Sequence, residues 1–117
     1  MAYKILLVDS ASERRGRLAK TLSSQGFDIS ESAGAIDAAK SLVVENFDTI
    51  VCEVEMEGVS GIDFLKTVKR REEWQYTLFF LVADEAGVKY QSEAIESGAD
   101  AFILRPADEL ELAEKIN

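Results

Sequence analysis

The chain has 117 residues, 47% of them hydrophobic, with one cysteine, one proline and no histidine. That length suits one hydrophobic core, so we expect a single domain over residues 1–117. A formal net charge of −9 disfavours nucleic acid and anionic membranes as partners, and the lack of histidine excludes Ser/His or Cys/His catalysis and most zinc sites.

The first elements follow from short sequence signals. Residues 5–8 form an apolar run that predicts a buried strand. Ser10 is followed three residues later by Glu13, which is the spacing of a capping box, so we expect a helix to begin there and to end at Gly26. Residues 27–31 alternate apolar and polar side chains, which predicts a strand at the edge of a sheet.

The strand and helix signals continue to alternate along the rest of the chain. Ile36, Ala39 and Val43 recur at helical spacing, which predicts a second helix. Residues 49–52 predict a third strand, which ends at Glu53. The remaining predicted elements are a loop at 58–61, a helix containing residues 62–68, a strand at 78–82, a helix at 88–97, a strand at 101–104 and a helix at 108–116.

Five strands that are each followed by a helix indicate an α/β protein with a parallel sheet covered on both faces. We expect a flavodoxin-like (βα)5 doubly wound fold with strand order 2-1-3-4-5, because right-handed crossovers leave few other windings. In such sheets, ligands bind beyond the carboxyl ends of the strands, where the strand order reverses.

This rule selects candidate site residues before any family is considered. Asp9 and Ser10 follow the first strand, Glu53 ends the third, residues 82–84 follow the fourth and Arg105 follows the fifth. Two carboxylates here, with a backbone carbonyl from the next residues, resemble a loose site for a hard cation. Spacing leaves a second interpretation open, in which Arg105 pairs with Glu53 or Asp9 and neutralises a crowded strand edge.

Three segments resemble response-regulator receiver domains: residues 4–9, 58–61 and 97–106. The resemblance covers essentially the whole chain, in order. It implies that a histidine kinase passes a phosphoryl group to an aspartate at the end of the third strand. It also implies a magnesium ion held by that aspartate and an acidic pair after the first strand. A hydroxyl after the fourth strand and a lysine after the fifth would hold the phosphoryl oxygens.

The sequence departs from this pattern at four positions. Asp9 matches the first acid, whereas the positions of the second acid, acceptor, hydroxyl and lysine carry, respectively, Ser10, Glu53, Val82 and Arg105. Pro106 is retained, and Phe102 stands where the family carries a switching aromatic, which we interpret as a plain core residue. The implied metal ligands become Asp9, Glu53 and Glu55, and they are expected to hold magnesium weakly or not at all.

Each departure weakens phosphorylation. Ser10 removes a carboxylate, and Val82 has no hydroxyl. Glu53 is one methylene longer than aspartate, and phosphoryl transfer depends on positioning. Arg105 keeps the charge of lysine, but its planar fork favours a carboxylate partner, so we predict a Glu53–Arg105 ion pair.

We therefore expect a non-enzymatic, two-component receiver-like module that works through protein–protein interaction, independently of phosphorylation. The alternatives are a residually phosphorylatable, magnesium-dependent receiver and a small-molecule sensor that uses the vacated pocket. No cofactor is expected beyond weakly held Mg²⁺. The longest apolar run, residues 78–83, is too short to span a membrane, and a lone cysteine fits a cytoplasmic protein.

Two surfaces are candidates for partner contact. The acidic half formed by the predicted elements at 88–97, 101–104 and 108–116 is, by resemblance, where a partner protein or a fused output domain binds. The first predicted helix carries a basic cluster, and by resemblance it is where a histidine kinase makes contact. That cluster consists of Arg14, Arg15, Arg17 and Lys20.

Overall fold

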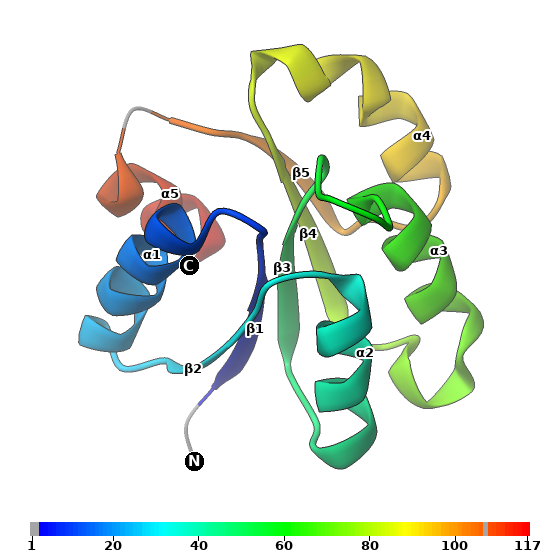
Figure 1. Ribbon diagram of the computed structural model, residues 1–117, viewed down its shortest axis with the longest axis horizontal. Coiled ribbons are helices and arrows are strands. Elements are labelled where there is room, and N and C mark those ends of the chain that lie inside the picture. The colour runs from blue at the N-terminus through cyan, green and yellow to red at the C-terminus, as the bar shows by residue number, and fades with distance from the viewer. Residues whose placement is uncertain (1–2, 107) are drawn as a thin grey trace.

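The computed structural model describes residues 3–106 and 108–117, and it contains a parallel sheet in the order β2-β1-β3-β4-β5 (Figure 1). The predicted fold class and strand order are confirmed. The strands are β1 (Lys4–Val8), β2 (Asp28–Ser32), β3 (Thr49–Glu53), β4 (Leu78–Ala83) and β5 (Ala101–Leu104).

Helices cover both faces of the sheet, α1 and α5 on one side and α2, α3 and α4 on the other (Figure 1). Their bounds are α1 (Ser12–Ser24), α2 (Ala35–Val44), α3 (Gly61–Arg70), α4 (Gln91–Glu96) and α5 (Glu109–Ile116). Two 3₁₀ segments, η1 (Glu72–Trp74) and η2 (Glu85–Tyr90), flank β4. Within the residues described, no helix is long and apolar enough to cross a membrane.

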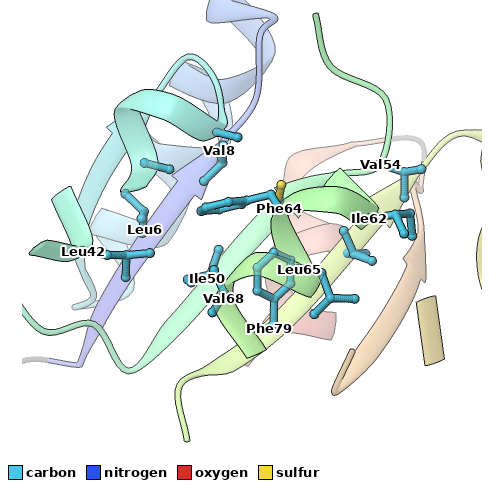
Figure 2. Packing of buried hydrophobic residues seen from close by; sticks show 14 of the residues in the cluster. Leu6, Val8, Leu42, Ile50, Val54, Ile62, Phe64, Leu65, Val68 and Phe79 are labelled. Carbon is cyan, nitrogen blue, oxygen red and sulfur yellow. The ribbon is translucent and has the colours of Figure 1, made fainter. Parts of the chain in front are cut away.

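The larger core lies between the sheet and α2, α3 and α4. Phe64, Leu65 and Val68 of α3 point toward the sheet in Figure 2 and are buried there. The ring of Phe64 meets the ring of Phe79 edge-on, with centroids 5.7 Å apart. This packing holds the start of α3 close to the end of β3, where Glu53 lies.

The smaller core lies beneath α1 and α5 and contains Leu18, Leu22, Val51, Val82 and Leu112. Successive side chains of a strand point to opposite faces of the sheet, so Val51 and Glu53 of β3 both face this side. The parallel register pairs Glu53 with Val82 of β4. The helices α1 and α5 therefore frame the end of β3 on which the candidate site is built.

The predicted capping box at Ser10 is wrong. α1 begins at Ser12, and no side chain caps its first turn at Ala11. The Asp9 carboxylate accepts a hydrogen bond from the Ala11 backbone N–H at 2.9 Å, so this short acidic side chain organises the turn before the helix. The Ser10 hydroxyl instead accepts a bond from the Glu57 backbone N–H at 3.4 Å.

The predicted second helix is confirmed as α2, but two of the three apolar residues that predict it do not face the core. Ile36 and Val43 are exposed, whereas Ala35, Ala38 and Leu42 of α2 are buried. Both sets of residues have helical spacing, but they are offset by one residue and therefore lie on different sides of the helix. The small alanines face the sheet, which leaves the larger side chains outside.

The predicted helix at 88–97 is only partly confirmed. Its first part belongs to the 3₁₀ segment η2, and the α-helical part α4 is Gln91–Glu96. Gly87 is buried in η2, and a Cβ atom there would lie 2.9 Å from the Ala83 Cβ. This close approach brings η2 against the end of β4.

Candidate functional site at the strand ends

The candidate site is a cluster of charged side chains at the carboxyl ends of the strands. Asp9 follows β1 and Glu53 ends β3, and both are buried. Among the residues that the structure describes, Asp9 and Glu53 are the only charged residues that are buried. We call Asp9, Arg14, Glu53, Asp84 and Arg105 the strand-end cluster.

Arg105 binds two acidic residues of the strand-end cluster. Its guanidinium donates one hydrogen bond to Glu53 Oε2 and another to Asp84 Oδ1. The predicted Glu53–Arg105 ion pair is thus present in the structure. Because Arg105 follows β5, Asp84 follows β4 and Glu53 ends β3, one side chain ties the ends of three strands together.

Arg14 lies on the near side, and the sequence interpretation missed it as a site residue. Its Nε donates to Asp9 Oδ2 at 2.7 Å and its Nη2 donates to Asp9 Oδ1 at 2.6 Å. The same Nη2 is 3.5 Å from Glu53 Oε1. A usable signal was present, because a cation in the first turn of a helix opposes the helix dipole and therefore calls for a nearby acid.

Val82 does not line the cavity beside Glu53, which corrects the predicted switch position. Its side chain is fully buried in the core under α1 and α5. Ala83, the next residue, lines a cavity of about 210 Å³ together with Glu53 and Asp84. Ala83 is the last residue of β4, so it lies one position nearer the carboxyl edge of the sheet, where the cavity is. Alanine has no hydroxyl either, so the chemical consequence predicted for Val82 applies equally to Ala83.

The other predicted site residues lie around the cluster. Pro106 lines a second cavity, of about 100 Å³, beside Asp9, Glu53 and Arg105. Phe102 is half-buried and packs against the larger core. Ser10 and Glu55 are exposed, and Glu55 lines the 210 Å³ cavity.

The basic cluster of the first helix is largely turned toward this chain's own acids. Arg14 binds Asp9, Arg15 binds Glu31 at 3.0 Å, and Arg17 binds Glu109 of α5. These pairs neutralise much of the surface that the resemblance linked to a histidine kinase.

Comparison with known proteins accounts for this architecture. The family description "Response regulator receiver domain" matches residues 5–117. The chain belongs to this family. The receiver domain is 30% identical over 115 residues to chemotaxis protein CheY-3 of Vibrio cholerae serotype O1, an alignment that covers 97% of this chain and 88% of that protein. It is 32% identical over 114 residues to chemotaxis protein CheY of Pseudomonas aeruginosa, and this alignment covers 97% of this chain and 92% of that protein.

Solved structures show the same fold. The chemotaxis response regulator CheY4 of Vibrio cholerae has a TM-score of 0.91 to this receiver domain at 22% identity, and the match covers 99% of this chain and 97% of that one. The protein is therefore a two-component receiver domain of the CheY type.

The strand-end cluster of this receiver domain does not fit a divalent metal ion. Both oxygens of Asp9 accept hydrogen bonds from Arg14, and Glu53 is bound by Arg105. The Glu55 side chain is exposed and lines the same cavity as Glu53, but the Arg14 guanidinium contacts both Asp9 and Glu53. Over residues 3–106 and 108–117, no group of three or more acidic or cysteine side chains is placed to hold a metal ion.

Opposing effects of burial and of neighbouring charges set the pKa of the Glu53 carboxyl. Burial is the largest effect and raises its pKa, the negative charge of Asp9 also raises it, and the net pKa is about 7 against an ordinary 4.5. The hydrogen bond and the charge of Arg105 lower the pKa, and Arg14 lowers it as well, but burial outweighs them. The carboxyl of Glu53 therefore changes protonation near neutral pH.

This balance predicts a pH-dependent stability. Between the unfolded pKa of 4.5 and the folded pKa of about 7, the folded state binds one more proton than the unfolded state. The free energy of unfolding should therefore fall as pH rises, by about 2 kcal/mol between pH 5 and 7.5, relative to Glu53→Gln. Urea unfolding of both proteins across this range measures the difference. Parallel pH profiles for the two proteins would contradict the assignment to Glu53.

Proposed function

We propose that this receiver domain acts without phosphorylation, as a non-enzymatic module that binds a protein partner or an attached output domain. The observation that carries the proposal is the bridge from Arg105 to Glu53 and Asp84. An intramolecular ion pair occupies the carboxyl that stands at the acceptor position.

The chemistry of the strand-end cluster supports this proposal. A carboxylate that accepts a phosphoryl group needs a free oxygen, an in-line approach and a cation to neutralise charge. In this chain, Arg105 is hydrogen-bonded to Oε2 of Glu53, and Arg14 stands 3.5 Å from Oε1. Neither Val82 nor Ala83 brings a hydroxyl to the cavity.

A partner surface is available on the α4, β5 and α5 side. Ile95, Leu104 and Leu110 are exposed there, one from each element. The segment that contains them, residues 84–117, carries far more acidic than basic side chains. Exposed apolar side chains within an acidic surface favour a protein partner that carries apolar and basic groups.

The small-molecule alternative receives less support from the cavities. Those beside Glu53 measure about 100 and 210 Å³, whereas pockets for small molecules are usually at least about 300 Å³. Charged side chains that already bind one another line both cavities.

A titration with a phosphoryl mimic tests the proposal. The amide NMR signals of Asp9, Glu53 and Arg105 should stay unchanged when Mg²⁺ and then beryllofluoride are added, because Arg14 and Arg105 already neutralise the carboxylates that would bind the cation and the phosphoryl mimic. Intact mass measured after incubation with acetyl phosphate should show no added phosphate. Saturable shifts that spread from the cluster to α4 and β5 would instead establish a phosphorylatable receiver.

A further inference from the structure

We propose that Arg14 is the resident cation of the strand-end cluster: this chain excludes divalent cations by supplying its own, and loss of Arg14 opens a divalent-cation site at Asp9 and Glu53. The inference rests on the proposed function and deepens it, because it names the side chain that keeps the cluster closed to metal.

The contacts of Arg14 are those expected of such a counter-ion. Its guanidinium binds Asp9 through two nitrogens, at 2.7 Å from Nε and 2.6 Å from Nη2. It also faces Glu53 at 3.5 Å, so one group spans the ends of β1 and β3. These are the two carboxylates that a divalent ion at this edge would have to bridge.

The position of Arg14 in α1 supports a specific role. It is the third residue of the helix, where the dipole disfavours positive charge. The neighbouring arginines of α1 make other contacts: Arg15 donates to the Asp9 backbone carbonyl and pairs with the Glu31 carboxylate, and Arg17 pairs with the Glu109 carboxylate. The Arg14 side chain is therefore held against the dipole by Asp9, whose carboxylate is buried and needs a partner.

The charges of the cluster explain why a metal ion is excluded. Arg14 and Arg105 face Asp9, Glu53 and Asp84, which leaves at most one uncompensated negative charge. A divalent ion would meet two guanidinium groups at close range. Without Arg14 the carboxylates outweigh Arg105, and Mg²⁺-type ions bind such sites through one or two carboxylates with water completing the shell.

The test uses Mn²⁺ alone, a paramagnetic ion that broadens nearby amide signals, on the full chain and its variants. In Arg14→Gln, Mn²⁺ should broaden the signals of residues 9–11 and 53–55, with an affinity at least about tenfold above wild type. Arg14→Lys keeps the charge and should behave as wild type. Arg17→Gln removes a neighbouring cation that pairs elsewhere, and it should also leave the cluster unbroadened.

Two further variants test whether the bound ion lies at the strand-end cluster and whether the effect depends on the residue that replaces Arg14. Adding Asp9→Asn to Arg14→Gln should abolish the gain, which separates the cluster from other acidic surfaces. Arg14→Ala serves as the second variant if Arg14→Gln does not fold. The inference is overturned if wild type binds Mn²⁺ at the cluster as tightly as the Arg14 variants, or if those variants stay silent. Silent variants leave the proposed function intact, whereas a wild-type response to beryllofluoride overturns the proposed function.

Discussion

Replacing Arg105 with glutamine is expected to lower the free energy of unfolding by about 4 kcal/mol at pH 8, where Glu53 is ionised. The loss is large because the substitution leaves a buried carboxylate without its cation, while Arg14 remains 3.5 Å away and already binds Asp9. Glutamine keeps the stem of arginine as far as Cδ but lacks the two terminal nitrogens that bond Glu53 and Asp84, so lost packing contributes to the effect alongside the lost charge. Urea unfolding of the two proteins measures the difference.

A double-mutant cycle separates the ion pair from other effects of the substitution. Glu53→Gln combined with Arg105→Gln should recover a large part of the loss, because two neutral side chains leave no buried charge uncompensated. Arg71→Gln is a matched control, since Arg71 forms an exposed pair with Glu73 and lies over the Trp74 ring, and its removal should cost no more than about 1 kcal/mol. Equal losses for Arg105→Gln and Arg71→Gln would show that the buried pair contributes little.

Gly61→Ala should destabilise the domain by about 3 kcal/mol, through overpacking against backbone. A Cβ atom at Gly61 would lie 2.1 Å from the carbonyl oxygen of Glu53 and 3.0 Å from the Val54 Cα. Neither backbone atom can move without shifting the end of β3. The Gly61 N–H also donates to the Val54 carbonyl at 2.9 Å, which holds the two segments together.

Gly16→Ala provides the control for this prediction. Gly16 lies inside α1, and a Cβ atom there meets nothing within 4 Å. Alanine should therefore stabilise the helix by about 1 kcal/mol, because it loses less backbone entropy on folding. Opposite signs for the two substitutions are the expected result from urea unfolding. A stability loss at Gly16 as large as that at Gly61 would remove the steric explanation.

Much of the fold could be predicted from local patterns. The continuous apolar runs at 5–8 and 78–82 indicate strands buried on both faces, and their alternation with helices leaves few possible windings. The Glu53–Arg105 pair follows from the same rule, because strand order alone places the ends of the third and fifth strands at one edge of the sheet.

The errors lie where one residue position decides the outcome. Val82 and Ala83 are the last two residues of β4, and only the folded structure shows that Val82 is buried in the core while Ala83 lines the cavity. Helical spacing predicts α2 but does not show which of its sides is buried, because that depends on how closely the helix approaches the sheet. Arg14 was missed as a site residue because its contact with Asp9 depends on the conformation of the turn before α1. Hydrophobic periodicity does not predict the conformation of such a turn.

The bridge from Arg105 to Glu53 and Asp84 also bears on how long a signal lasts. A module that is switched by gaining and losing a covalent group carries its own timer, set by the lifetime of that group. A module whose strand ends are tied by a permanent ion pair has no such timer. Under the proposed function, the duration of its signal is set by how much of the protein is present and by how slowly its partner dissociates.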